Sequence, residues 1–136
     1  MADERRRLAS VTMAVRWRDM DENGHVNNAA FFTYMEQARI DWFREIGLHN
    51  TVDGHGPVVA SASCEYRRAL EYPATIAVTL ECGPPGRSSF TLYNSIWLES
   101  DPAAIYAEGR FVLVWVDRAS GKSVPLPDAM RRRLTG

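Results

Sequence analysis

The sequence lacks the features that mark an exported, membrane-spanning or metal-binding protein. Its two cysteines, Cys64 and Cys82, have neither C-x-x-C nor metal-ligand spacing, and we expect both to be buried thiols. No stretch approaches the roughly 20 apolar residues of a membrane span. No apolar run follows the arginines of the opening "MADERRRLAS". These absences predict a cytoplasmic protein with no membrane partner.

A surplus of charge is absent as well. Lys and Arg (16) nearly balance Asp and Glu (17), and the net charge of −1 leaves the chain without the field that holds a polyanion. We therefore expect no nucleic-acid partner, although local basic spots stay open. The chain contains no repeat, linker or low-complexity segment, which predicts one domain over residues 1–136 with its own core.

The first third of the chain changes its hydrophobic period. Residues 12–18 alternate apolar and polar side chains, which predicts a half-buried strand. Between residues 28 and 46 the apolar side chains gather on one side at about 100° per residue, which predicts a long amphipathic helix. Asn27 or Asn28 can cap the start of this helix, and Gly47 marks its end. The expected apolar face comprises Phe31, Phe32, Met35, Ala38, Trp42, Phe43 and Ile46.

The remainder of the chain has the pattern of strands separated by turns. We expect strands at residues 58–68, 75–82, 88–99 and 104–116. Gly109 suggests a bulge or bend in the last of them, and a short helix is expected after Pro127. An antiparallel sheet of this size needs cover on one face, and the long helix is available to provide it. The pattern predicts an α+β fold in which the helix lies across the sheet.

The loop between the first strand and the long helix partly matches a calcium-binding loop. Asp19, Asp21, Asn23 and Gly24 occupy the first four fixed positions of the template D-x-[DN]-x-[DN]-G-x5-E. The last position, which supplies a bidentate glutamate, is Ala30. A strand rather than a helix also enters the loop. We therefore expect no metal site here.

Two other interpretations of this loop stay open on the residues alone. It can be a tight strand-to-helix connection, because Asn23–Gly24 favours a turn and an asparagine caps the helix. It can also be an active site, because Asp21 and His25 precede a helix N-terminus with unpaired N–H donors. Such a junction suits acyl transfer, in which a carbonyl oxygen binds the N–H groups while the carboxylate attacks or activates water.

Residues 16–39, "RWRDMDENGHVNNAAFFTYMEQAR", resemble the start of hotdog-fold acyl-CoA thioesterases of the 4-hydroxybenzoyl-CoA thioesterase-like group. The segment is also similar to long-chain acyl-CoA and acyl carrier protein thioesterases. The resemblance continues through "CEYRRALEYPATIAV", "GRSSFTL" and "GKSVPLP". It implies a hotdog fold, in which an antiparallel sheet of five to six strands wraps around one long central helix. It also implies a homodimer, often paired again into a tetramer, with active sites at the subunit interface.

The resemblance implies a role for each residue of the loop. Asp21 matches the catalytic carboxylate, acting as nucleophile or as general base toward the thioester carbonyl, whereas Asp19 is expected to be structural. Asn23 and His25 match polar catalytic partners. His25 would orient water or donate a proton to the departing thiolate. The backbone N–H of Asn28 matches the oxyanion donor.

Four further positions receive roles in the same way. Glu36 matches a second catalytic or supporting carboxylate, and it can also form an i,i+3 ion pair with Arg39, a cation on the apolar face of the helix. Arg87, Ser88 and Ser89 resemble the segment that contacts the pantetheine and phosphates of coenzyme A. The resemblance implies neither a metal ion nor an organic cofactor.

The sequence thus predicts an acyl-CoA or acyl carrier protein thioesterase that releases a free acid and a thiol. Two rivals stay open. One is an acyl-thioester dehydratase or hydratase on the same fold, which would use a different His/Asp or His/Glu arrangement. The other is an acyl-thioester sensor that binds without turnover. The acyl group, its carrier and the pathway are beyond what the sequence specifies.

Overall fold

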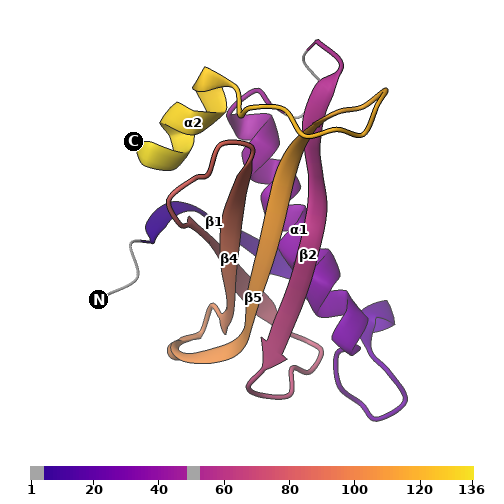
Figure 1. Cartoon of the computed structure of the whole chain (residues 1–136). Helices are drawn as coiled ribbons and strands as arrows, with labels where there is room; N and C mark the ends of the chain where they lie inside the picture. The colour runs from indigo at the N-terminus through magenta and orange to yellow at the C-terminus, as the bar shows by residue number, and fades with distance from the viewer. Residues whose placement is uncertain (1–4, 49–52) are drawn as a thin grey trace.

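The computed structural model describes residues 5–48 and 53–136, and Figure 1 shows their arrangement. Residues 1–4, part of the opening stretch that suggested no export signal, lie outside the described residues. The elements in chain order are β1 (Arg6–Ala14), the 3-10 turn η1 (Trp17–Asp19), α1 (Asn28–Glu45), β2 (His55–Tyr66), β3 (Thr75–Cys82), β4 (Ser89–Leu98), β5 (Asp101–Asp117) and α2 (Asp128–Thr135).

The five strands form one antiparallel sheet in the order β1-β3-β4-β5-β2. The helix α1 crosses one face of this sheet, and α2 lies beside β1 near the chain end (Figure 1). A five-stranded antiparallel sheet against one long helix is the hotdog arrangement, so the predicted fold class is confirmed. Among the residues described, no helix combines the length and the apolar content that crossing a membrane requires.

The core lies between α1 and the helix-facing side of the sheet. The alternation predicted for β3 is confirmed, because Ile76, Val78, Leu80 and Cys82 are all buried. On α1 most of the predicted apolar face is buried, and Tyr34 and Arg39 are buried with it. Cys64 differs from the expectation for both cysteines, since it lies on the edge strand β2 and is only partly buried.

The strand predicted at residues 12–18 is wrong in its second half. β1 ends at Ala14, and residues 17–19 form η1, where the side chain of Trp17 is 75% exposed. The Asp19 carboxylate accepts hydrogen bonds from the Arg16 backbone N–H at 2.9 Å and from the Tyr34 hydroxyl at 2.7 Å. This cap turns the chain away from the sheet, and hydrophobic alternation carries no signal of it.

Gly109 does not mark a bulge. Its pairings with Cys64 on β2 and Asn94 on β4 continue the regular register, and the register shifts lie elsewhere in those ladders. A Cβ atom at this position would meet the side chain of Met35, which descends from α1 onto the sheet. The glycine is therefore needed for the close approach of the helix to β5.

Candidate active site

The loop between η1 and α1 is closed by its own backbone. The Asp21 N–H donates to the His25 carbonyl at 2.8 Å, and the Gly24 N–H donates to the Asp21 carbonyl at 3.2 Å. Gly24 has a φ of +79°, in the left-handed region that favours glycine. The predicted Asn23–Gly24 turn is therefore present, and it brings residue 25 back beside residue 21.

Three hydrogen bonds attach this loop to the rest of the fold. The Asn27 N–H donates to the Asp19 carbonyl at 2.8 Å, and the Val26 N–H donates to the Leu70 carbonyl at 2.7 Å. The Tyr66 hydroxyl, at the end of β2, donates to the Asn28 carbonyl at 2.9 Å. The position of the loop thus depends on residues some 40 positions later in the chain.

The start of α1 presents a free donor. Of the two candidate caps, Asn27 is the one used, since its Oδ1 accepts the Ala29 N–H at 2.9 Å. The N–H of Asn28, the first residue of the helix, has no acceptor among the described residues. The partial positive charge at a helix N-terminus favours an oxygen carrying negative charge at this point.

Asp19 is saturated with hydrogen bonds. It is buried, and its carboxylate accepts from the Arg16 backbone, the Arg16 guanidinium and the Tyr34 hydroxyl. Burial by itself would raise the pKa of Asp19, but these hydrogen bonds outweigh it and lower the pKa below its ordinary value. Burial and the bond to Asp19 together raise the pKa of Tyr34.

Because its carboxylate is committed in this way, Asp19 does not join Asp21 in a cation-binding loop. Nowhere in residues 5–48 and 53–136 do three or more His, Cys, Asp or Glu side chains gather as they would to hold a metal ion. The described loop does not bring together the several carboxylates that calcium needs, and the absence of a metal site stays a prediction.

Asp21 is only half satisfied. Its Oδ1 accepts the N–H groups of Asn23 at 2.9 Å and His25 at 3.4 Å. Its Oδ2 has no partner in the described part of the chain. The side chain is partly exposed, so this oxygen can accept a proton or attack a bound electrophile.

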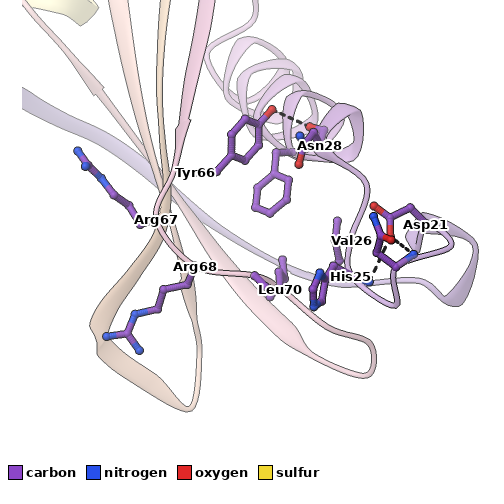
Figure 2. A pocket seen from close by; sticks show the side chains of 11 residues that line it. Asp21, His25, Val26, Asn28, Tyr66, Arg67, Arg68 and Leu70 are labelled. Atoms are coloured by element: carbon purple, nitrogen blue, oxygen red, sulfur yellow. Dashed lines mark hydrogen bonds between the residues drawn. The ribbon is translucent and has the colours of Figure 1, made fainter.

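Four predicted residues line one cleft of about 320 Å³, namely Asp21, Asn23, His25 and Asn28. Figure 2 shows that the opposite wall comes from the end of β2 and the segment that follows it, residues 66–70. The aromatic ring of Phe31 and the side chain of Val26 supply apolar lining. The cleft is thus lined by a residue with a free carboxylate oxygen, Asp21, and by the first residue of α1, Asn28.

Among the lining residues that were not predicted to belong to the site, three have polar side chains, namely Tyr66, Arg67 and Arg68. Arg67 is held by Glu108, with Nε at 3.1 Å and Nη2 at 2.8 Å from the same carboxylate oxygen. Arg68 lies over the ring of Tyr106, 6.0 Å from its centroid. These contacts depend on the pairing of β2 with β5, and only their place in the quoted "CEYRRALEY" marked them in the sequence.

The side chain of His25 is turned toward the rim of the cleft. Its Nε2 lies 3.8 Å from a carboxylate oxygen of Glu71, and Figure 2 shows the ring beside Leu70. Only the backbone of His25 contacts Asp21 directly. His25 therefore lines the same cleft as Asp21, but its imidazole does not bond to that carboxylate.

Glu36 and the Arg87 turn lie outside this cleft. Glu36 is exposed and lies 3.9 Å from Arg39, in the i,i+3 pair that was predicted. Residues 87–89 lie at the opposite end of the sheet from the Asp21 loop, because Ser89 pairs with Val114 near the end of β5 (Figure 1). The Arg131 side chain holds this turn through the carbonyls of residues 86 and 87. One chain alone does not bring these residues to Asp21.

Comparison with known proteins defines the class to which this fold and cleft belong. Residues 15–134 match the model of the thioesterase-like superfamily, and the chain therefore belongs to that superfamily. Family membership supports thioester hydrolysis as its general activity.

Individual relatives agree over nearly the whole chain. The protein PA2801 of Pseudomonas aeruginosa, described as a candidate thioesterase, is 39% identical with a TM-score of 0.88, covering 93% of this chain and 98% of that one. A thioesterase of Thermus thermophilus, complexed with coenzyme A and Zn, is 34% identical with a TM-score of 0.77, covering 92% and 90%. The long-chain acyl-CoA thioesterase FadM of Escherichia coli is 25% identical over 122 residues, covering 88% and 92%.

Proposed function

We propose that this protein hydrolyses acyl-CoA thioesters, or acyl carrier protein thioesters, with Asp21 as the catalytic carboxylate and the Asn28 N–H as the oxyanion donor. The observation that carries the proposal is that Asp21, whose Oδ2 is free, and Asn28, whose N–H is unpaired, line the same cleft. Coenzyme A is favoured as the carrier by the relatives, one of which is an acyl-CoA thioesterase and another a thioesterase complexed with coenzyme A.

The reaction needs only groups that line the cleft. With the carbonyl oxygen on the Asn28 N–H, Asp21 takes a proton from water as the water oxygen bonds to the acyl carbon. The C–S bond then breaks, the acid is released and the thiolate takes up the proton. Alternatively, Asp21 attacks the carbon itself and water hydrolyses the resulting anhydride. An oxyanion donor of this kind typically contributes about 3 kcal/mol to transition-state stabilisation.

Asn23 and His25 support this chemistry from the loop. The Asn23 side chain lines the cleft beside Asp21, where its amide can hydrogen-bond the attacking water. The His25 imidazole, at the rim, is within the same cleft and would give a proton to the departing thiolate. Neither role needs a hydrogen bond to Asp21 in the absence of substrate.

The proposal includes a homodimer formed through β2, with further pairing into a tetramer. Within the described chain β2 pairs only with β5, so its other edge has free backbone donors and acceptors. Val58 and Val59 on this strand are 38% and 45% exposed. An exposed apolar edge strand invites pairing with a second copy, and a two-fold axis makes that pairing antiparallel.

Antiparallel pairing of two β2 strands would also explain the residues outside the cleft. The start of β2 in the second protomer would lie beside Tyr66 in the first. The end of the second protomer's sheet that carries the Arg87 turn would then approach the Asp21 loop of the first protomer. Glu36, Arg87, Ser88 and Ser89 thus enter the proposed site from the second protomer, where the last three would contact coenzyme A.

A thiol-release assay over short, long, branched and aromatic acyl-CoAs tests the activity. Asp21→Asn is expected to lower kcat about 10²- to 10⁴-fold while the protein stays folded. Glu22→Gln, which changes the neighbouring exposed carboxylate, is the matched control and should keep full activity. Full activity of Asp21→Asn would refute the assignment, and tight binding without thiol release would favour a sensor.

A single turnover in ¹⁸O-labelled water distinguishes direct attack of water on the acyl carbon from attack of water on the Asp21 carboxyl carbon of an anhydride. If Asp21 is a general base, the label enters the released acid during the first turnover, because water attacks the acyl carbon directly. If Asp21 is the nucleophile and water attacks the anhydride at the Asp21 carboxyl carbon, the label enters that carboxylate. The released acid then carries an unlabelled oxygen from Asp21.

A further inference from the structure

Arg39 on α1 is a buried cation that the described residues satisfy only in part. Its side chain is 8% exposed, and its Nη1 is buried with no hydrogen-bond partner among them. Its nearest acidic group is Glu36 at 3.9 Å, a side chain that is itself 64% exposed. Phe111 lies below the guanidinium at 5.1 Å. A buried donor without a partner is costly, so an acceptor is expected in the functional molecule.

Arg39 lines a pocket of about 190 Å³ between the second half of α1 and the start of β2. Ile40, Phe43, Val59 and Leu113 make the wall mainly apolar. Arg118 also lines the pocket, but its Nη2 donates to the Pro57 carbonyl at 3.4 Å. An apolar pocket lined by a buried guanidinium with an unsatisfied donor suits a ligand with a hydrocarbon body and an oxygen at its end.

This pocket and the proposed catalytic cleft lie at opposite ends of β2, because one is lined by Pro57 and Val59 and the other by Tyr66. Asn28 and Arg39 are eleven residues apart on the helix, which corresponds to about 16 Å. A short acyl group held at Asn28 cannot span that distance in one protomer. Antiparallel pairing of two β2 strands reverses the second strand, so the Pro57 end of one protomer would face the Tyr66 end of the other.

We propose that the Arg39 pocket of one protomer receives the far end of the acyl group whose thioester is held in the cleft of the other, and that Arg39 selects acyl groups ending in a carboxylate. This inference rests on the proposed hydrolysis and dimer. The ligand carboxylate would complete the unsatisfied Nη1 with a charge-assisted hydrogen bond.

A purely structural role leaves Nη1 unexplained. The pair with Glu36 is long, its acidic partner is mostly exposed, and it involves Nη2 rather than Nη1. Replacing a buried charge with an apolar side chain of similar volume is often neutral or stabilising. Arg39→Met should therefore fold, because Glu36 would be left in water rather than in the core.

The test compares substrates of equal chain length that differ only at the far end. Succinyl-CoA is paired with butanoyl-CoA, adipoyl-CoA with hexanoyl-CoA, and suberoyl-CoA with octanoyl-CoA. At the length with the highest ratio of kcat/KM for the carboxylate over the alkyl substrate, Arg39→Met is expected to lower that ratio roughly ten- to hundredfold. Arg39→Lys should retain part of the preference, and Arg44→Met, an exposed cation on the same helix, should retain all of it.

Mixed dimers show from which protomer Arg39 acts. Consider a dimer of one Asp21→Ala chain and one Arg39→Met chain. Only the Arg39→Met chain retains Asp21, so only its cleft is active. If the site spans the interface, this cleft faces the intact Arg39 of the Asp21→Ala chain. The carboxylate preference of the wild type should then survive. A preference as low as that of the Arg39→Met homodimer would overturn the arrangement.

An unchanged ratio in Arg39→Met at every chain length would refute the selectivity. Dissociation of the Arg39→Met dimer with an unchanged ratio would equally refute it, because the second chain would then supply the acceptor. Neither result bears on hydrolysis itself, which fails only if Asp21→Asn stays fully active. The two proposals can therefore be rejected separately.

Discussion

The loop before α1 carries two carboxylates, Asp19 and Asp21, in opposite surroundings. On the helix-facing side of the loop Asp19 is buried and accepts hydrogen bonds from Arg16 and Tyr34. On the cleft side Asp21 is partly exposed, with one oxygen held by two backbone N–H groups and the other free. A saturated carboxylate is a structural cap, whereas a carboxylate with a free oxygen is available for chemistry.

The difference shows how one short segment serves folding and reaction at once. Asp19 fixes the turn at residues 16–19, and its carbonyl accepts the N–H of Asn27, which caps α1. The loop that contains Asp21 is thereby held at both ends, by the turn at residues 16–19 and by the start of α1. Positioning of this kind matters because displacement of a reacting group by about 1 Å can cost roughly 100-fold in rate.

The difference between the two carboxylates is tested most directly by removing each of them in turn. Asp19→Ala should lower the free energy of unfolding by about 3 kcal/mol, because it leaves the buried Tyr34 hydroxyl without its acceptor. Asp21→Ala should lower it by less than about 1 kcal/mol, since only bonds in a partly exposed turn are lost. Urea denaturation measures both. Equal losses would show that the two carboxylates do not divide their roles in this way.

Removing the hydroxyl of Tyr34 tests the Asp19 side alone. Tyr34→Phe should lower the free energy of unfolding by about 2 kcal/mol, the usual magnitude for a buried hydrogen bond to a charged group. The double variant Asp19→Ala/Tyr34→Phe should lose less than the sum of the single variants, because the two residues share one bond. Additive losses in denaturation experiments would contradict the coupling.

His25 tests the cleft side. His25→Gln should lower kcat about tenfold if the imidazole protonates the leaving thiolate, with little change in stability because the side chain is half exposed. Glu71→Gln serves as the control for the neighbouring carboxylate. Steady-state kinetics with an acyl-CoA and a thioester of a more acidic thiol provide the measurement. Equal loss with both substrates would argue against protonation of the leaving group.

Acid should reduce the contribution of Asp19 to the free energy of unfolding, and this is the smallest effect that we predict. The pKa of Asp19 is lowered in the folded protein, so its contribution is complete above the unfolded value of about 3.9 and is lost as the pH falls through the folded value. The stability difference between wild type and Asp19→Asn should stay constant from pH 7 to about pH 5 and shrink below pH 4. A constant difference down to pH 3 would contradict this linkage.

The parts of the fold that follow from local pattern were well predicted. The helix predicted at residues 28–46 agrees with α1 to within one residue, because its apolar spacing and both its ends depend on neighbouring residues. The strand at residues 75–82 agrees with β3, since full alternation over eight residues leaves little freedom. The prediction for residues 12–18 was wrong only beyond Ala14, where Asp19 holds a turn and is itself bonded by Tyr34, fifteen residues away.

The cleft was predicted on one side only. Asp21, Asn23, His25 and Asn28 are close in the sequence, and the resemblance pointed to them together. The opposite wall, residues 66–70, reaches them through the Tyr66–Asn28 and Val26–Leu70 hydrogen bonds. The local sequence of residues 66–70 does not specify which loop they face, because strand pairing depends on residues far apart in the chain.

By itself the sequence determined the helix, the sheet strands and the polar loop at the helix start, since periodicity, turn residues and capping act over a few neighbouring positions. The tertiary structure decided which carboxylate is committed and which is free, and where the cation of Arg39 lies without a full set of partners. The physical reason is that burial and hydrogen-bond saturation depend on residues brought together from distant parts of the chain.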